Sequence, residues 1–255
     1  MILPYIHGFN ELELYNNQIT DAVSSAILFA VFCNPTIRRI TVAYNYMRNT
    51  FTQCLSKLIA QRPDKIDEIN IMGSILYADH IDPLVRVFPK MSSLALLNIA
   101  GCSLTQSSCR EISKFMMTCP TIRSLDVSHC RISYQGSRYF IEALNRNQSI
   151  RNFNFSHNDL TSSKFEFSIL IAAIITRHPS LQHIDITNTN LKREEIMFVG
   201  LSLPISKTML SVHLTAQKLP YYERIFLRAA IAARVGFQYR STTQRKQIQS
   251  NKEKN

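Results

Sequence analysis

Residues 122–132 read IRSLDVSHCRI, and residues 150–160 repeat the same pattern as IRNFNFSHNDL. Both follow the form LxxLxLxx(N/C)xL, with apolar residues at the first, fourth, sixth and eleventh positions and asparagine or cysteine at the ninth. The middle of the pattern alternates apolar and polar residues, as a half-buried β-strand does. The two copies start 28 residues apart, which leaves room for a helix between successive strands.

Eight copies of this pattern occur along the chain, and their ninth positions are separated by 28, 29, 28, 28, 28, 31 and 28 residues. A repeat of this length cannot bury its apolar side alone, whereas stacked repeats share one core. We therefore predict an α/β leucine-rich repeat solenoid of about eight repeats, a horseshoe with a parallel concave β-sheet and convex α-helices. The ninth positions are Asn17, Asn45, Ser74, Cys102, Cys130, Asn158, Thr189 and Gln217.

The sequence after each strand indicates where its helix begins. Thr20 can cap the first helix, and Asp21 suits the positive N-terminal end of that helix. Thr105 and Ser133 mark the starts of later helices in the same way.

The sixth repeat has the widest spacing, and we attribute this to a longer helix around residues 167–175. That stretch is apolar nearly all round, so it is either a well-buried helix or part of an exposed contact site, and burial is the commoner case. Pro120 and Pro179, each just before a new strand, are expected to close the helices of the fourth and sixth repeats.

The chain divides into three predicted segments. Residues 1–219 form the solenoid, residues 220–238 a C-terminal capping helix, and residues 239–255 a disordered basic tail. Residues 220–255 hold eight basic residues against two acidic ones, out of a total net charge of +11. The chain begins about ten residues before the first strand pattern, which leaves little room for a terminal cap. We therefore expect an upstream continuation of the solenoid or a second subunit over that edge.

The composition is that of a soluble folded protein, with 45% hydrophobic and 18% charged residues. It has no apolar run long enough to span a membrane and no secretion signal in its first residues, MILPYIHGF, so we predict a cytoplasmic protein. The six cysteines form no CxxC pair, and two of them occupy ninth positions. They are expected to be reduced structural thiols.

Taking the fifth, seventh and eighth positions of each repeat as the concave face gives a polar surface. It is not basic, which argues against a specific nucleic-acid groove. Tyr15 and Tyr44 lie together near its N-terminal end, where they could anchor a protein partner or cover the exposed sheet edge. The predicted partner-binding residues are Glu13, Tyr15, Tyr44, Asn70, Asn98, Asp126, His129, Asn154, His157, Asp185 and His213.

His129 and His157 occupy the eighth position of adjacent repeats, with Asp126 or Asp185 nearby. Such a set could bind zinc if its geometry were suitable, but repetition of one residue in a column is also what repeat duplication produces. No glycine-rich phosphate loop, nucleophile elbow or HExxH motif occurs. We therefore predict no enzyme activity, no metal and no cofactor.

The 28-residue period and the stretch NQSIRNFNFSHNDL, residues 147–160, resemble the ribonuclease-inhibitor-like class of leucine-rich repeat proteins over residues 9–219. That class includes the Ran GTPase-activating protein, tropomodulin, the CARMIL actin regulators and the sensor domains of NOD-like receptors. Residues 206–233 are also similar to the end of the CARMIL solenoid. The resemblance implies a protein that binds other proteins.

Three functional hypotheses follow. The first is a non-catalytic scaffold that binds an unidentified protein partner through its concave face. The second, implied by the resemblance, is a small-GTPase-activating or actin-regulatory protein, although the basic tail differs from the acidic tail of the Ran regulator. The third is weak electrostatic contact between the basic C-terminus and anionic surfaces.

Overall fold

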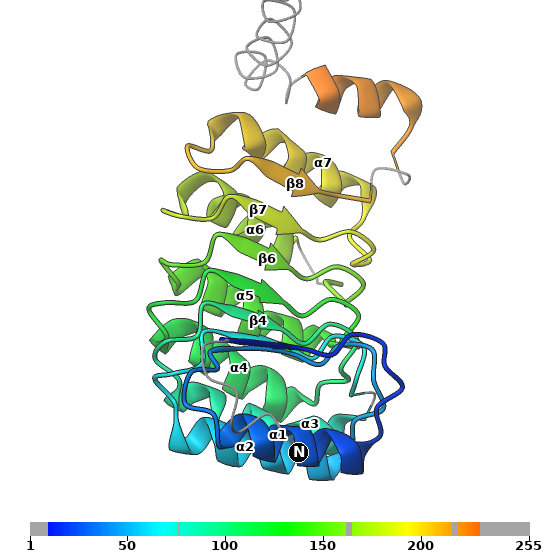
Figure 1. The fold of residues 1–255 in the computed structure, drawn as a ribbon. Helices are drawn as coiled ribbons and strands as arrows, with labels where there is room; N and C mark the ends of the chain where they lie inside the picture. The colour runs from blue at the N-terminus through cyan, green and yellow to red at the C-terminus, as the bar shows by residue number, and fades with distance from the viewer. Residues whose placement is uncertain (1–9, 76, 162–164, 216–218, 230–255) are drawn as a thin grey trace, which may run out of the picture.

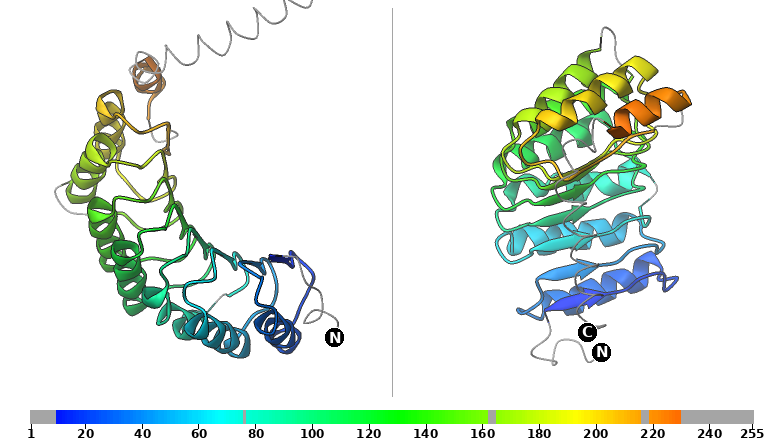
Figure 2. Two further views of the ribbon diagram at one scale, coloured as in Figure 1. Left: turned by 60° about the vertical axis from the view of Figure 1, so that its left-hand side comes forward. Right: turned by 90° about the horizontal axis from the view of Figure 1, so that it is seen from above.

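The computed structural model describes residues 10–75, 77–161, 165–215 and 219–229. Within these ranges, eight short strands form one parallel sheet in which their order follows the chain. The helices all lie on one side of this sheet, so the sheet lines the inside of an arc and the helices its outside (Figure 1; Figure 2, left). The predicted α/β horseshoe of eight repeats is confirmed.

The elements alternate strictly along the chain. The strands are β1 (Glu11–Glu13), β2 (Arg39–Thr41), β3 (Glu68–Asn70), β4 (Leu96–Asn98), β5 (Ser124–Asp126), β6 (Asn152–Asn154), β7 (His183–Asp185) and β8 (Ser211–His213). The α-helices are α1 (Asp21–Phe32), α2 (Asn49–Gln61), α3 (Ala78–Val85), α4 (Gln106–Thr118), α5 (Tyr134–Arg146), α6 (Glu166–Arg177) and α7 (Arg193–Ser202). Two short 3-10 helices, η2 (Phe88–Lys90) and η3 (Leu203–Ile205), come after α3 and α7.

Every strand is built from the third, fourth and fifth motif positions, and the fourth points into the core. Leu97 of β4 pairs in register with Leu125 of β5, and both side chains are buried. Ile122 and Val127, at the first and sixth positions around β5, are fully buried as well. The motif therefore identified the inward-facing residues correctly in these central repeats.

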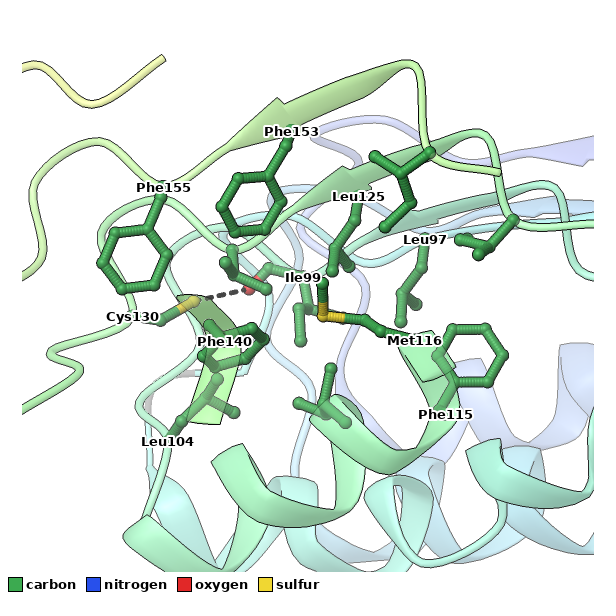
Figure 3. Close-up of a cluster of buried hydrophobic side chains, with 14 of the residues drawn as sticks. Leu97, Ile99, Leu104, Phe115, Met116, Leu125, Cys130, Phe140, Phe153 and Phe155 are labelled. Atoms are coloured by element: carbon green, nitrogen blue, oxygen red, sulfur yellow. Dashed lines mark hydrogen bonds between the residues drawn. The ribbon is translucent and has the colours of Figure 1, made fainter. Parts of the chain in front are cut away.

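The core is one continuous layer between the sheet and the helices. Figure 3 shows the part contributed by the fourth to sixth repeats, where Phe115 and Met116 of α4 and Phe140 of α5 lie under the strands. The rings of Phe140 and Phe155 are 5.8 Å apart, and neither side chain has any exposed surface. Because each repeat packs on the side chains of its neighbours, the stability of one repeat depends on the next.

The ninth-position asparagines satisfy the backbone of two adjacent turns. The amide oxygen of Asn158 accepts hydrogen bonds from the backbone N–H groups of Cys130 (3.1 Å) and Ile132 (3.0 Å) in the preceding repeat. Its amide nitrogen donates to the carbonyl oxygens of Val127 (2.8 Å) and Phe155 (3.1 Å). Asn45 bonds in the same way to the first repeat. Without these bonds the turns would hold buried polar groups with no partner.

Cysteine replaces asparagine at the ninth position of the fourth and fifth repeats. The Cys130 thiol donates to the carbonyl oxygen of Ile99 at 3.2 Å, the dashed line in Figure 3. All six cysteines are free, and burial raises the pKa of the Cys102 and Cys109 thiols to about 12. Both thiols therefore stay protonated and poorly nucleophilic at neutral pH, as the structural role predicted for them requires.

Helices α4 and α5 begin, and helices α4 and α6 end, where the sequence predicts, with one difference in detail. Thr105 caps α4, because its hydroxyl oxygen accepts a hydrogen bond from the N–H of Ser108 at 3.0 Å. Ser133 does precede α5, but its side chain makes no capping bond. Helices α4 and α6 end two residues before Pro120 and Pro179, as expected from the exclusion of helical backbone before proline.

Asp21 begins α1, as predicted, but its carboxylate serves the next helix. It accepts hydrogen bonds from the backbone N–H groups of Arg48 (2.7 Å), Thr50 (3.1 Å) and Phe51 (3.0 Å) at the start of α2. Burial alone would raise the pKa of Asp21, but these bonds and the Thr50 hydroxyl outweigh it and lower the pKa. The position of Asp21 in the sequence suggested a contact with its own helix, α1. The stacking of the repeats instead brings the start of α2 within hydrogen-bonding distance of its carboxylate.

The attribution of the wide sixth spacing to a longer helix is wrong. Helix α6 has 12 residues and is one residue shorter than α4 and α5. The extra residues lie in the connection before α6, part of which, residues 162–164, is outside the described ranges. Most apolar residues of α6, such as Phe167 and Ile171, are buried, although Ile169 is 52% exposed. The length of a loop leaves no periodic trace in the sequence, so spacing alone could not separate the two cases.

Residues 221–229 are helical and lie against the end of α7. Leu227 is buried over Gly200, where even a methyl group would collide with the Leu227 side chain. Arg193 of α7 donates from Nε to a carboxylate oxygen of Glu223 at 2.8 Å and from Nη2 to the Tyr222 hydroxyl at 3.1 Å. The proposed capping role of residues 220–238 and the proposed tail of residues 239–255 reach beyond the described ranges and stay predictions.

His178 provides a pH-dependent contribution to stability. This buried side chain follows α6, and its Nδ1 accepts hydrogen bonds from the backbone N–H groups of Leu181 (2.9 Å) and Ser180 (3.3 Å). Burial lowers its pKa, against a smaller opposing effect of nearby backbone carbonyls. His178 thus binds a proton more readily in the unfolded chain than in the folded one. Its contribution to the free energy of unfolding is complete above about pH 6.5 and falls as the pH drops toward the pKa of His178 in the folded chain.

We expect His178→Asn to remove this pH dependence, because Asn147 caps the equivalent loop of the preceding repeat through its amide oxygen. Between pH 7 and pH 5 the wild type should lose more stability than the variant, because the unfolded chain takes up a proton at this position more readily than the folded chain. Urea unfolding across this pH range measures the difference, with exposed His183→Asn as the matched control. Equal slopes for the wild type and His178→Asn would refute this role.

Candidate functional site

The concave face consists of the third, fifth and seventh motif positions. In β4 to β6 the third and fifth residues flank the buried fourth residue and are partly or fully exposed. No helix covers this side of the sheet among the described residues (Figure 2, left). The third position was missed in the sequence analysis, although strict strand alternation could have revealed it. The missed residues are Glu11, Arg39, Glu68, Leu96, Ser124, Asn152, His183 and Ser211.

The fifth-position residues hold the turn that ends each strand. In five successive repeats, a side-chain oxygen at this position accepts a hydrogen bond from the backbone N–H two residues later, as in an Asx-turn. The Asp126 carboxylate also accepts from the Ser128 hydroxyl at 2.7 Å and from the Asn154 amide at 3.0 Å. The residues that make these turns are Asn70, Asn98, Asp126, Asn154 and Asp185. These residues therefore combine a structural role with exposure on the predicted binding face.

The concave face is acidic, in contrast to the basic chain as a whole. Its third, fifth and seventh positions hold five carboxylates and a single basic side chain other than histidine. Arg39 is that side chain, and it pairs with Glu11 at 3.1 Å at the N-terminal end. Toward the other end, His183 Nδ1 lies 2.6 Å from the Ser211 hydroxyl. The five carboxylates are Glu11, Glu13, Glu68, Asp126 and Asp185.

The eighth motif position does not continue the strand face. Its residues have positive φ angles of 53° to 76°, because the chain turns sharply there as it leaves the sheet. We call this row the rim. Three of the predicted partner-binding residues, Tyr44, His129 and His157, thus lie on the rim and not on the face itself. The described rim residues are Asn16, Tyr44, Gly73, Gly101, His129, His157 and Asn188.

Two tyrosines occupy the N-terminal end of the site. Tyr15, at a seventh position, and Tyr44, on the rim, contact each other edge-to-face with ring centroids 5.2 Å apart. A Cβ atom on Gly73 would lie only 2.6 Å from the Tyr44 ring. The absence of a side chain at Gly73 therefore leaves the space that the ring occupies. The two tyrosines remain 53% and 45% exposed. The structure therefore brings together the pair selected from the sequence, in a form that leaves both rings accessible.

His129 and His157 also meet on the rim. Their rings stack 3.8 Å apart at an angle of 16°, and Nε2 of His157 lies 3.1 Å from the side-chain nitrogen of Asn188. Burial lowers the pKa of His129, the charge of His157 adds to this effect, and Asp126 opposes it. In stacked rings the nitrogen lone pairs lie in two parallel planes and point the same way. A nitrogen of His129 and a nitrogen of His157 therefore cannot both point at one metal ion between the rings. No cluster of three or more potential metal ligands occurs in the described parts of the chain.

Comparisons with known proteins support the assignment of the leucine-rich repeat fold. The model of the family described as "Leucine Rich repeat" matches residues 118–138. The chain is similar in structure to the tropomodulin C-terminal domain of Caenorhabditis elegans, with a TM-score of 0.50 and 16% identity over 70% of this chain and 97% of that one. The described residues thus have a leucine-rich repeat fold, and one of the repeats also matches the family model in sequence.

Two further structures were found at lower TM-scores. The leucine-rich repeat-containing protein LegL7 of Legionella pneumophila matches with a TM-score of 0.45 and 19% identity over 84% of this chain and 68% of its own. Leiomodin-1 actin-binding site 2 matches with a TM-score of 0.41 and 15% identity over 76% and 95%. No curated protein sequence matches the chain significantly. The chain has the fold of a leucine-rich repeat solenoid in which each described repeat from the first to the seventh carries a helix.

Proposed function

We propose that this protein is a non-catalytic scaffold that binds a protein partner through its concave face, and that the partner presents a basic surface. The supporting observation is the open sheet with five carboxylates in a chain of net charge +11. A negative patch attracts a positive partner and disfavours nucleic acid, whose phosphates it would repel. Tyr15 and Tyr44 add an exposed aromatic anchor at one end.

The shape of the face favours a macromolecular partner. Eight strands present a broad curved surface, with side chains held in fixed rows by the Asx-turns at the strand ends. A preorganised surface costs less conformational entropy on binding than a flexible one. The eight exposed or half-exposed polar residues at the fifth position from Glu13 to His213, together with the missed third position, constitute the contact area that we propose.

Charge reversal on the concave face tests the proposal. The variant Glu13→Lys with Glu68→Lys changes two exposed or half-exposed carboxylates, one in the first repeat and one in the third. We expect binding of a partner captured with the wild type to weaken at least about tenfold, since two favourable charge contacts become repulsive. Binding is measured by surface plasmon resonance at several salt concentrations, and the wild-type affinity should fall as salt increases.

The matched control is Glu111→Lys with Glu194→Lys, which makes the same charge change on the outer helices α4 and α7. If both variants bind the partner as the wild type does, the concave face is not the binding surface. If both weaken it equally, net charge alone accounts for the effect. Circular dichroism ensures that the compared variants are folded.

The second candidate is a small-GTPase-activating or actin-regulatory protein. It is motivated by the sequence resemblance and the fold shared with tropomodulin, while the likeness in structure itself concerns the fold alone. Turnover assays with small GTPases and co-sedimentation with filamentous actin distinguish it from the scaffold. Stimulated GTP hydrolysis would overturn the expectation that the protein is not an enzyme.

A contact of the C-terminus with anionic membranes is the third candidate, and a cytoplasmic location is proposed with it. Within the described ranges, no helix has the length and apolar character needed to cross a membrane. Salt-sensitive binding to liposomes containing phosphatidylserine, lost on deletion of residues 220–255, would support the contact. Binding that survives this deletion would reject it.

A further inference from the structure

A basic groove lies on the lateral edge of the solenoid, away from the concave face. It forms where the chain passes from the ends of α4, α5 and α6 to β5, β6 and β7, on the side where the strand arrows begin in Figure 1. The connecting segments are residues 118–124, 146–152 and 177–183, and they contain no acidic residue. We call this surface the edge groove.

The edge groove is hollow and lined by arginines. A depression of about 530 Å³ is bordered by Arg123, Arg146 and Arg151, together with polar residues that include Ser149 and Ser180. A second hollow of about 110 Å³ shares Arg146 and adds Arg177. The four arginines therefore border two hollows that share Arg146, and they come from the three helix-to-strand connections of the groove.

These arginines lack acidic partners, unlike basic residues in the same place in earlier repeats. Arg38 pairs with Asp67 at 2.6 Å, and Lys65 pairs with Asp64 at 3.3 Å. Among the described residues, no ion pair involves Arg123, Arg146, Arg151 or Arg177. The positive charge of the edge groove is thus not neutralised by the fold.

Part of this arrangement has a structural explanation. Arg123 donates to the carbonyl oxygens of Pro120 at 2.8 Å and Ile122 at 3.3 Å, which holds its side chain against the backbone of its own connecting segment. Arg146 and Arg177 lie in the last turns of their helices, where a positive charge stabilises the helix dipole. Arg151 has neither role. It neighbours Arg123 across two adjacent repeats, since its N–H donates to the Arg123 carbonyl at 2.8 Å.

We propose that the edge groove binds an extended segment rich in aspartate and glutamate from a protein partner. Guanidinium groups pair with carboxylates through two parallel hydrogen bonds, and a row of them along three helix-to-strand connections suits carboxylates spaced along an extended chain. No phenylalanine, tyrosine or tryptophan lines the hollows, so single-stranded nucleic acid would lack a stacking surface. This proposal concerns a different surface and does not depend on the concave-face partner.

Fluorescence anisotropy with a labelled peptide of about ten alternating glutamates and serines tests the proposal, with a peptide containing glutamine in place of glutamate as the probe control. The variant Arg146→Glu with Arg151→Glu alters two exposed side chains. We expect it to bind the acidic peptide at least about tenfold more weakly than the wild type, because two attractive contacts become repulsive. The wild type should not bind the glutamine peptide.

The control variant is Lys57→Glu with Arg86→Glu, which makes the same charge change at exposed positions outside the groove. It should bind the acidic peptide within about twofold of the wild type, since neither side chain lines the hollows of the groove and exposed charges are screened by salt. Equal weakening in both variants would assign binding to net charge and overturn the proposal. Displacement of the peptide by inorganic phosphate, or by an oligonucleotide at equal charge, more readily than by unlabelled acidic peptide would overturn it as well.

Discussion

Replacing Asn158 with alanine should destabilise the protein by about 4 kcal/mol, because two buried N–H groups and a buried carbonyl lose their partner at about 1–3 kcal/mol each. The side chain is 5% exposed and bonds to both the fifth and the sixth repeat. Its loss therefore affects the joint between two repeats and not one turn alone. Urea unfolding followed by circular dichroism measures the change in the free energy of unfolding.

The matched comparison is Asn158→Cys, since cysteine occupies this position in the two preceding repeats. The Cys130 thiol donates to Ile99, the carbonyl equivalent to Val127 in the bonding of Asn158. A cysteine at position 158 should recover this bond but not those to the two N–H groups, so about half the loss should remain. If alanine and cysteine cost the same, or if alanine costs less than about 1 kcal/mol, the asparagine does not stabilise the joint as described.

Phe155→Ala should cost about 4 kcal/mol through loss of apolar contact and the cavity left behind. The ring is fully buried and lies 5.8 Å from the rings of both Phe140 and Phe153 (Figure 3). The surrounding residues come from the sheet and from helix α5, and both are held by neighbouring repeats, so the site cannot collapse freely. Chemical denaturation measures the loss.

Two other variants test whether the loss of stability comes from the cavity left in the core or from the removal of any phenylalanine ring. Phe155→Leu places the residue found at the sixth position of the first and eighth repeats, Leu14 and Leu214, and should cost about 1.5 kcal/mol. Phe226→Ala removes a ring that is 57% exposed and should cost less than about 0.5 kcal/mol. A similar loss for Phe155→Ala and Phe226→Ala would contradict the assignment of Phe155 to the core.

The fold could be predicted from the sequence because each position of the motif has a known structural requirement. Residues such as Leu125 and Val127 recur at spacings that only a stacked strand can bury, and Asn158 marks a turn whose backbone needs a side-chain partner. Contacts between repeats were harder to foresee. Asp21 appeared to serve its own helix, yet stacking places it at the start of α2.

The candidate site was predicted in part. Glu13 and Asp126 lie on the concave face as expected, whereas His129 and His157 lie on the rim, because the eighth position adopts a positive φ angle that spacing does not reveal. The acidic character of the face emerged only when the third position, which contributes Glu11 and Glu68, was included. The edge groove could not be predicted from spacing, because its arginines come from three separate helix-to-strand connections and meet only in the folded chain.

Carboxyl footprinting of the protein with and without a partner captured from native cytosol tests the central claim most directly. The reagent modifies accessible carboxylates, so each concave residue reports on contact by itself. We predict that partner binding protects Glu13, Glu68 and Asp185, while Glu111 and Glu194 on the outer helices are modified to the same extent as before. Protection of the outer carboxylates with no change on the concave face would contradict the claim.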